Sequence, residues 1–474
     1  MEYPIFDVPL LGGSLLIAAI SIFHAFIAHF SVGSGFLMAL AQRRAIRDND
    51  LGMSQALRKY AFGVLLVPYV LGTVSGVGIW FSIALAGPRA VSILIHQFVW
   101  FWAIEWVLFL VEGLAIHLYV FHWDRMSPRD HNRLAWIFAA CSVGTLLVIN
   151  AILSFMLTPG QWKPFDAGTL VYKGVLNPGY VPTSLGRILI SLALAGAGGV
   201  VLASLTRSID EQARRKLVRI SCAMILPIIL CLPLGAWTFA ALAPRSQNFI
   251  TGGAPVMMIF LNVGLAGMLI LFLAAAVSYF RRDFTAGSLG GVTMCLLALA
   301  AYGSMEFVRE GVRKPFIIEG FMYSTGVTVA GAAAVDPVAN LDRTRREGIL
   351  AVTPWALPGG SAVAGLSPAQ RGQAVYRAAC LRCHCIDGYN AMRPQVATWR
   401  RETIRGLLDH MDEVKPAMPP FPGNQAEKDA LTEFLLGLNP HPLMSPGAAR
   451  GESAGTSGNH QTPHIPAARA AGME

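Results

Sequence analysis

The chain has 474 residues, a mean hydropathy of +0.51 and only 14% charged residues. Soluble proteins carry about a quarter charged residues, so this composition excludes an ordinary soluble enzyme and predicts a membrane protein. The formal net charge is +9, but the basic residues lie in short clusters between apolar runs, which is typical of membrane topology rather than of nucleic-acid binding.

Eight apolar runs are long enough to cross a bilayer, which takes about 20 apolar residues per helix. They cover residues 11–41, 58–86, 92–121, 134–158, 184–206, 218–243, 254–280 and 287–309. The first lacks a basic leading segment and is too long for the apolar part of a signal peptide, so we expect a retained span. A ninth apolar stretch, residues 315–335, contains Glu319 and several glycines. We expect it to lie on the surface or to re-enter rather than to span.

Basic residues are concentrated in every second connection between the predicted spans. The first, third, fifth and seventh connections hold Arg43, Arg44, Arg47, Arg58, Lys59, Arg125, Arg129, Arg133, Arg207, Arg214, Arg215, Lys216, Arg219, Arg281 and Arg282. The even-numbered connections are poorer, with Arg89, Lys163, Lys173 and Arg245. By the positive-inside rule, the N-terminus and everything after the eighth span lie on the outer side of a bacterial inner membrane.

Ionisable side chains within the spans are costly and mark candidate functional sites. They are His24 and His29 in the first span, His96, Glu105, Glu112 and His117 in the third, and Glu306, Arg309, Glu310, Arg313 and Lys314 at the end of the eighth. Histidines and carboxylates in a helix bundle suit haem ligation or proton transfer, although a single histidine is as often a hydrogen-bonded core residue. Glu105 and Glu112 share one helix face, which indicates a proton path or, alternatively, a buried pair of neutral acids.

A C-x-x-C-H motif, Cys380 to His384, follows the spans and is typical of covalent c-type haem attachment. Two thiols one helical turn apart can each bond one porphyrin, and the adjacent imidazole can reach its iron. A zinc site would need a second ligand pair, and the sequence offers none. The best candidate for the second axial ligand is Met418, with Met392 and Met411 as competitors that more simply fill the core. Cys385 is assigned no role.

The predicted fold class is all-α, a polytopic transmembrane bundle of about eight spans plus a small α-helical cytochrome c domain. We expect a membrane domain that binds haem b at residues 1–335 and a Pro/Gly-rich linker at 336–365. The cytochrome c domain follows at 366–438, and a disordered tail at 439–474.

The C-terminal domain resembles class I cytochromes c, which implies that Met418 and His384 are the axial ligands of one covalent haem c on the outer side. Residues 15–320 resemble subunit I of the cytochrome bd-type quinol oxidases. Three places carry this resemblance: Phe23-His24 with Gly33 nine residues after the histidine, Glu112 with Trp123-Asp124-Arg125, and the segment from Glu310 to Phe316.

The bd resemblance implies that His24 binds a high-spin haem, that Glu310 also ligates haem, that Arg313 pairs with propionates and that Glu112 is essential. It implies one to three b-type haems, with a d-type haem as a further possibility. The sequence departs from the family at the quinol-facing haem. Ser191 stands where the family has a histidine in the fifth helix. Asn262 lies near the position of the family's methionine ligand in the seventh helix, although Met257, Met258 and Met268 are close by. The quinol loop is reduced to about residues 243–252. His29, His96 and His117 could bind a relocated b-type haem.

The leading hypothesis is a respiratory oxidoreductase subunit that passes electrons between an outer haem c and intramembrane b-type haems. The pathway would end in oxygen reduction, with Glu112 and Glu105 delivering protons. One alternative is an electron-transfer subunit between the quinone pool and periplasmic cytochromes or a partner enzyme; another is a haem-containing anchor. The expected partners are a second membrane subunit of bd-like type, a periplasmic cytochrome or quinone and the lipid bilayer, with no nucleic acid.

Overall fold

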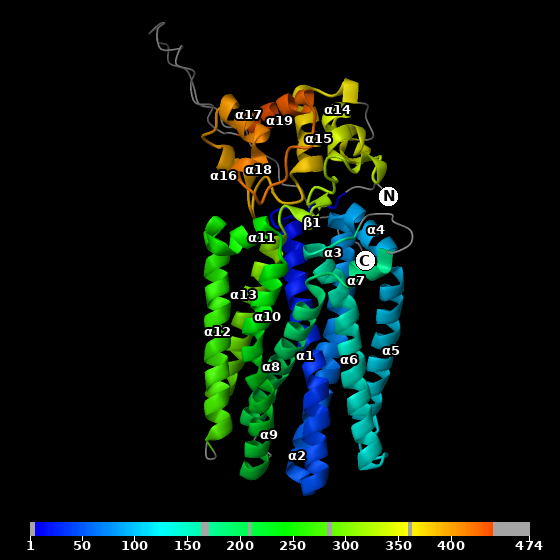
Figure 1. The fold of residues 1–474 in the computed structure, drawn as a ribbon, viewed down its shortest axis with the longest axis vertical. Coiled ribbons are helices and arrows are strands. Elements are labelled where there is room, and N and C mark those ends of the chain that lie inside the picture. The colour runs from blue at the N-terminus through cyan, green and yellow to red at the C-terminus, as the bar shows by residue number, and fades with distance from the viewer. Residues whose placement is uncertain (1–4, 163–169, 207–209, 282–286, 359–362, 439–474) are drawn as a thin grey trace, which may run out of the picture.

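The computed structural model describes residues 5–162, 170–206, 210–281, 287–358 and 363–438. A bundle of long helices carries a smaller helical domain on one end (Figure 1). Eight helical segments of the described chain are long and apolar enough to cross a membrane, which confirms the predicted all-α bundle of about eight spans. The predicted tail at 439–474 and the basic residues Lys163, Arg207 and Arg282 lie outside the described residues.

The spans follow the apolar runs closely, and three short helices join them near the end that bears the smaller domain. The spans are α1 (Gly12–Asp48), α2–η1–α3 (Leu51–Val64, Leu65–Leu71, Gly72–Ala86), α5 (Val99–Phe121), α6 (Pro128–Leu157), α8 (Tyr180–Leu205), α9–η2–α10 (Glu211–Ile225, Leu226–Leu230, Cys231–Ala241), α12 (Pro255–Phe280) and α13 (Ser288–Arg313). The joining helices are α4 (Pro88–Gln97), α7 (Leu170–Val175) and α11 (Pro244–Asn248), which runs into η3 (Phe249–Gly253).

Local sequence signals explain where several helices begin. Asp50 caps α2 by accepting a hydrogen bond from the Met53 amide, and Ser127 caps α6 in the same way. Within the second span, Pro68 lies in the π-helical turn η1, where the missing N–H group interrupts the regular α-helical pattern.

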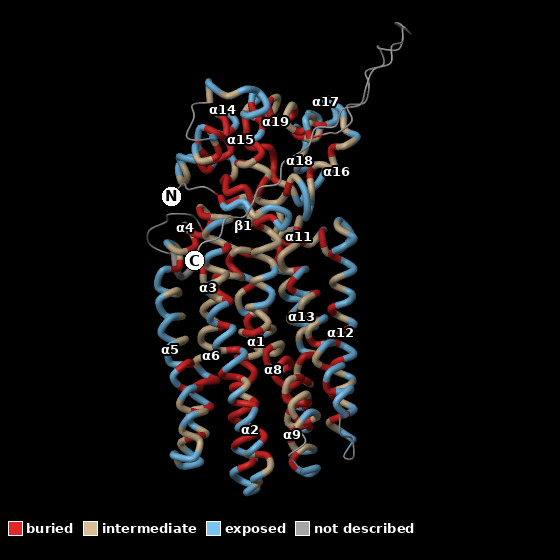
Figure 2. The backbone as a smooth tube through the Cα atoms, turned by 180° about the vertical axis from the view of Figure 1, so that it is seen from behind, coloured by how far each residue is buried: buried red, intermediate tan, exposed pale blue. Residues whose placement is uncertain are grey.

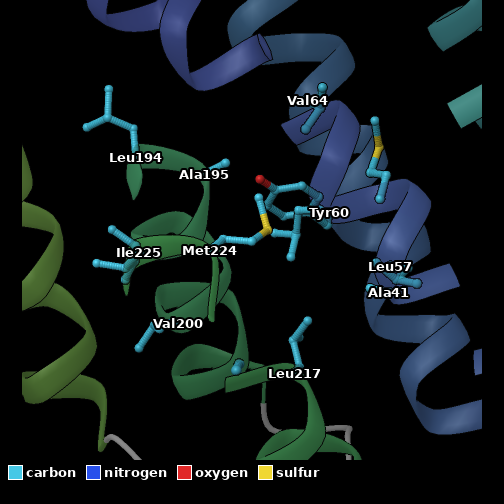
Figure 3. Packing of buried hydrophobic residues seen from close by; sticks show 14 of the residues in the cluster. Ala41, Leu57, Tyr60, Val64, Leu194, Ala195, Val200, Leu217, Met224 and Ile225 are labelled. Carbon is cyan, nitrogen blue, oxygen red and sulfur yellow. The ribbon is translucent and has the colours of Figure 1, made fainter. Parts of the chain in front are cut away.

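Small residues bring α1 into close contact with its neighbours at the centre of the bundle. A Cβ atom on Gly33 would lie 1.9 Å from the Ser191 carbonyl oxygen of α8, and one on Gly35 would lie 2.7 Å from Ala139 of α6. Buried residues cluster where α1, α8 and α9 meet, whereas much of α5 and α12 is exposed (Figure 2). Tyr60 and Leu57 of α2 are part of the same apolar core as Met224 and Ile225 of α9 (Figure 3).

The ninth apolar stretch does not cross the membrane. It forms the short antiparallel strands β1 (Phe316–Ile318) and β2 (Met322–Tyr323), followed by the 3-10 turn η4 (Ala332–Ala334). It lies between the bundle and the smaller domain (Figure 1). Because Ile318 and Met322 pack with Phe98 and Phe155 at the end of the bundle that bears the smaller domain, the stretch covers the bundle, as a surface-lying segment should.

The C-terminal part of the chain is a compact helical unit. It contains α14 (Leu341–Glu347), η5 (Ile349–Ala351), η6 (Pro354–Ala356), η8 (Val363–Gly365), α15 (Pro368–Ala379), α16 (Met392–Val396), α17 (Arg401–Asp409), α18 (Met411–Val414) and α19 (Gln425–Gly437). Helices α15 and α19 pack against each other, and a Cβ atom on Gly372 would lie 2.1 Å from the Ala430 carbonyl oxygen.

The described part of the predicted linker is folded into this unit. Ile349 and Leu350 are buried in the same core as Val375 and Leu431. The buried carboxylate of Glu427 in α19 accepts hydrogen bonds from the amides of Ile349 and Leu350, at 2.7 and 2.9 Å. The domain limits remain predictions, but residues before and after position 365 share one core.

Candidate haem sites

The C-x-x-C-H motif forms one tight turn at the end of α15. The Cys380 amide bonds to the Tyr376 carbonyl at 2.8 Å, and the amides of Cys383 and His384 both bond to the Cys380 carbonyl at 3.0 Å. Both thiols are free. A single turn of backbone therefore holds together the two sulfur atoms and the imidazole that a covalent haem requires.

The imidazole of His384 is oriented by neighbours close in sequence. Its Nδ1 lies 3.2 Å from the Asn390 carbonyl oxygen, so Nδ1 carries the proton and Nε2 is the basic nitrogen that can bind iron. The Tyr376 hydroxyl donates to the His384 carbonyl at 2.8 Å. Burial lowers the pKa of His384, which favours the neutral, ligating form. This donor set fits a c-type haem.

The three candidate methionines differ in their surroundings. Met392 belongs to the buried core of the domain and Met411 packs against it, whereas Met418 lies outside that cluster and is half-buried. The Met418 amide donates to the Lys415 carbonyl at 2.7 Å, and buried Pro419 and Pro420 follow. Met418 therefore stays the preferred second axial ligand.

His24 is held between α1 and α3 in a ligand-like orientation. Its Nδ1 lies 3.1 Å from both the Gly72 carbonyl oxygen and the Ser75 hydroxyl. Glycine faces the ring, since a Cβ atom on Gly76 would lie 3.1 Å from its Cε1. With the proton on Nδ1 toward the carbonyl, Nε2 is free to ligate iron. An apolar groove runs beside it, lined by Ala19, Ile20, Phe23, Val74, Ser75 and Gly78. These residues fit a haem at the edge of the bundle.

The two carboxylates of α5 have different environments. Glu112 is buried, and the Ser31 hydroxyl of α1 donates to it at 3.2 Å. Glu105 is half-buried between the exposed side chains of Ile104 and Trp106, and within the described part of the chain its carboxyl has no hydrogen-bond partner. The predicted pair is thus one enclosed carboxyl and one at the outer face of the bundle.

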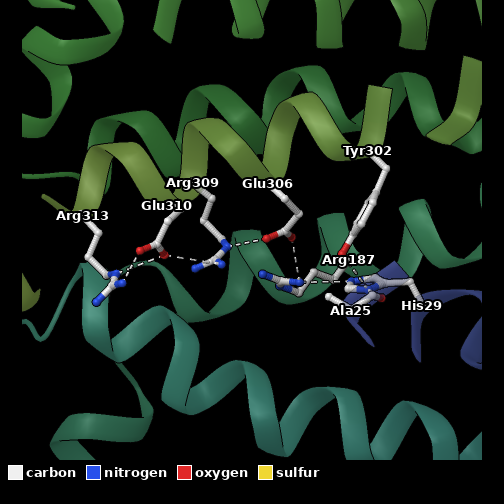
Figure 4. Close-up of polar contacts among 8 residues, drawn as sticks. All are labelled: Ala25, His29, Arg187, Tyr302, Glu306, Arg309, Glu310 and Arg313. Atoms are coloured by element: carbon white, nitrogen blue, oxygen red, sulfur yellow. Dashed lines mark hydrogen bonds and ion pairs between the residues drawn. The ribbon is translucent and has the colours of Figure 1, made fainter. Parts of the chain in front are cut away.

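Glu310 lies among cations in the last turn of α13. Arg313 forms an ion pair with it, and Arg309 lies 3.9 Å from its carboxylate (Figure 4). Lys314 lies 3.7 Å from the same carboxylate. One carboxylate among three cations suits a haem whose negatively charged propionates need partners, so these residues fit the role that the resemblance implies for Glu310 and Arg313.

Sequence reasoning missed a buried polar network that links α1, α8 and α13. Arg187 of α8 contacts His29 Nε2 at 3.1 Å and the Glu306 carboxylate at 3.4 Å (Figure 4). The Tyr302 hydroxyl lies 3.5 Å from His29 Nδ1, and Arg309 donates to Glu306 at 2.6 Å. Arg187 falls inside a predicted span. A single arginine within a span is costly unless it has a partner, and this could have indicated the network from the sequence.

The structure does not bring all candidate residues together. No hydrogen bond or ion pair among the described residues joins His24 to Glu310, which lie on different helices with different neighbours. His96 and His117 are exposed. The three histidines proposed for a relocated haem are therefore not gathered, and His29 is held by Arg187 instead.

The residues at the quinol-side haem position do not fit a haem. Ser191 is fully buried, its hydroxyl donates to the Arg187 carbonyl, and its own carbonyl lies against Gly33. Asn262 is exposed on the outer face of α12. Neither side chain faces a space that a porphyrin could enter, so we assign no step to this position.

Two family models match separate parts of the chain. Residues 14–248 match the family model for cytochrome bd terminal oxidase subunit I. Residues 367–435 match that for cytochrome c oxidase, cbb3-type, subunit III. Over 163 residues the chain is 26% identical to cytochrome bd ubiquinol oxidase subunit 1 of Bacillus subtilis strain 168. That match covers 32% of this chain and 34% of the relative, about a third of its length.

The fold is shared with a solved structure. The bd oxidase from Geobacillus thermodenitrificans superposes with a TM-score of 0.58 at 18% identity. The superposition covers 69% of this chain and 92% of that chain. At this identity the likeness shows the fold of the bundle and nothing about its ligands.

Proposed function

We propose, for a chain that combines a membrane region of the cytochrome bd subunit I type with a C-terminal cytochrome c domain, that it is a respiratory oxidoreductase subunit. In this proposal electrons enter at the C-terminal domain and oxygen is reduced within the bundle. Bound haems would supply single-electron transfer and, at the high-spin centre, the reduction of oxygen. The chain's own residues would hold these groups, neutralise their charges and deliver protons.

The orientation of His24 is the observation that carries the proposal. A carbonyl and a hydroxyl hold its Nδ1, while glycine and an apolar groove lie beside the ring. A merely structural histidine would be expected to use both nitrogens for hydrogen bonds within the core. The C-terminal motif shows the same pattern, because Asn390 holds Nδ1 of His384.

The carboxylates of α5 are well placed to deliver protons to the site beside His24. The first and third spans run in the same direction, and Ser31 contacts Glu112 at the same depth. Seven residues nearer the start of each helix, about 10 Å along the axis, lie His24 and Glu105. A proton that enters from the inner side of the membrane would therefore reach Glu112 first, and then Glu105 and the haem at the depth of His24. The buried Glu112 carboxyl could hold this proton on the way.

The cations around Glu310 would balance the charge of haem propionates. Arg313 and Lys314 contact the carboxylate from the outer end of α13. Fixed positive charge next to a haem favours its reduced form, so we assign these residues to binding and to setting the potential.

A second membrane subunit of bd-like type would cover α5. Glu105 lies between Ile104 and Trp106, which are 47% and 57% exposed. An ionisable side chain facing lipid tails is costly, so a protein partner that buries this face is favoured. Copurification of a second polytopic subunit with the chain, lost when Trp106 is replaced by Lys, would test this part of the proposal.

Spectroscopy of the purified protein tests the function. Reduced-minus-oxidised spectra with and without CO should show a high-spin, CO-reactive haem together with the c band, and a reduced cytochrome should support oxygen uptake. His24→Ala should remove the CO-reactive haem and leave haem c intact, whereas the exposed control His96→Ala should lose neither. Low-spin b and c bands alone, without a CO response, would instead support an electron-transfer subunit.

A further inference from the structure

The haem-attachment loop is bonded directly to the start of α1. The Tyr389 amide donates to the Leu10 carbonyl at 2.7 Å, and Gly388 and Leu10 form an isolated parallel bridge. Leu10 lies two residues before α1, the helix that carries His24. Gly388, on the other side of this contact, lies four residues after His384.

Glycine is required on the C-terminal side of this contact. Gly388 has a φ of +105°, and a Cβ atom there would lie 2.3 Å from the Leu10 carbonyl oxygen. Cys385 completes the contact, because its buried Sγ would lie 2.9 Å from a Cβ atom on Gly12. The cysteine without a role in the motif is therefore part of the docking contact.

A second contact joins the same loop to the segment that follows α13. Arg382, between the two haem cysteines, donates from Nη1 to the Ser324 carbonyl at 3.4 Å and packs over Gly326, where a Cβ atom would lie 2.5 Å from Nη1. Ser324 bonds in turn to the Pro315 carbonyl at 2.7 Å. Pro315 follows directly on the Glu310 to Lys314 cluster.

The connection between the two parts is rigid on its other side as well. Thr328 and Asn340 form an isolated parallel bridge, and Asp336 forms an ion pair with Arg89 of α4 in which both side chains are largely buried. Ala339 and Leu341, on either side of Asn340, are buried in the core of the C-terminal unit. The domain is therefore fixed on the bundle at several points and is not suspended on a flexible tether.

We propose that the C-terminal domain is a fixed intramolecular electron port, docked through Leu10, Gly388 and Arg382 above the helices that carry His24 and Glu310. One electron leaves ferrous haem c, which becomes ferric, and reduces a ferric haem of the bundle without movement of the domain. A one-electron donor protein then reduces haem c again. Gly12 and His24 are separated by about 18 Å along α1. The inference rests on the proposed function.

The test uses the full chain in lipid nanodiscs and two matched glycine variants. Gly388→Ala places a Cβ atom against Leu10, whereas the control Gly331→Ala has a similar positive φ of +80° and no atom within 4 Å. Hydrogen exchange at residues 386–391 reports docking, and flash reduction of haem c reports electron transfer to the bundle. The wild-type rate and the control rate should not depend on solvent viscosity.

Gly388→Ala should retain both kinds of haem, lose exchange protection of the Tyr389 amide and slow the transfer by about tenfold or more. Arg382→Ala tests the second contact without backbone strain and should have the same effect in weaker form. A wild-type transfer rate that falls as viscosity rises would overturn the proposal, as would unchanged protection in both variants. A missing CO response would instead overturn the proposed function, and the exchange result would still stand.

Discussion

The C-terminal domain and the membrane bundle build their candidate sites in different ways. In the domain, the groups that orient His384 come from Tyr376 and Asn390, within eight residues of it along the chain. In the bundle, Ser31 meets Glu112 across 81 residues and His29 meets Arg187 across 158. A covalently bound cofactor can be held by a short local scaffold, whereas a polar site between helices depends on tertiary pairing.

The largest expected effect tests whether the local site is independent of the bundle. Replacing both Cys380 and Cys383 by Ala removes both thioether bonds, so covalently bound haem c should be lost completely while the b-type haem content stays unchanged. Haem staining of denatured protein and pyridine haemochrome spectra measure the two quantities. Cys385→Ala is the matched control and should keep haem c. Loss of b-type haem in the variant that lacks both cysteines would show that the two sites assemble together.

Breaking the long-range network should destabilise the bundle strongly. Arg187→Met leaves the buried Glu306 carboxylate without one of its cations, at a cost of about 3–5 kcal/mol. Replacing both, as Arg187→Met with Glu306→Leu, should recover part of this loss, because the carboxylate that lost Arg187 is then absent, while Arg309 loses Glu306 and keeps Glu310 at 3.9 Å. Reversible unfolding in mixed micelles measures the difference.

Arg44→Ala provides the control for this network. Arg44 pairs with Asp48 at 2.7 Å, but its side chain is 47% exposed, so its loss should cost no more than about 1 kcal/mol. Equal effects of the Arg187 and Arg44 variants would contradict a buried, coupled network.

Glu112→Gln should lower oxygen uptake by about 100-fold or more, because an amide cannot carry a proton. The hydrogen bond from Ser31 can persist, so the haem spectra should not change. Glu105→Gln should have a smaller effect, and the exposed control Glu347→Gln none. Oxygen-electrode rates with an excess of electron donor provide the measurement, and unchanged uptake in the Glu112 variant would remove it from the proton path.

The smallest expected effect is at Asp50, where a local and a distant contact can be tested on one side chain. Asp50 accepts a hydrogen bond from the Met53 amide at 3.0 Å and one from Lys216 at 2.8 Å. Burial acts to raise its pKa, but Lys216 and the amide outweigh this and hold the pKa of Asp50 below its usual value. Its ionised form therefore stabilises the protein at neutral pH, and this contribution disappears as the pH falls through the lowered pKa.

Asp50→Ala should cost about 1 kcal/mol at neutral pH, since it loses both the cap and the ion pair. Asp50→Asn keeps the cap and should cost less. Unfolding titrations at neutral and acidic pH measure both variants, and their difference from wild type should shrink in acid. A difference that grows in acid would mean that the pKa shift has the opposite sign.

The sequence predicted the spans well because apolar content alone determines which segments enter a bilayer. The predicted run 254–280 agrees with α12 almost residue by residue. The run 92–121 concealed a break at Phe98 between α4 and α5, because no proline or glycine marks the junction in the sequence. Apolar composition therefore predicts which segments lie in the membrane, but it does not predict where a helix breaks within such a segment.

The candidate sites were less predictable where partners lie far apart. Arg187 escaped notice because nothing near it in sequence identifies His29 or Glu306 as its partners. The linker was predicted from its proline and glycine content, which concealed the buried Ile349 and Leu350. The roles predicted for Cys380, Cys383 and His384 needed only the motif, whereas those of His24 and Glu310 rested on a family resemblance. All of these roles remain proposals.

The contact between Leu10 and Tyr389 also constrains the order of biosynthesis. Leu10 is made long before Tyr389, and its carbonyl receives the Tyr389 amide only after some 380 further residues have been synthesised. All eight spans must be inserted before the two segments can meet on one side of the membrane. The docked contact is therefore a mark of completed assembly, which a chain interrupted before residue 389 cannot acquire.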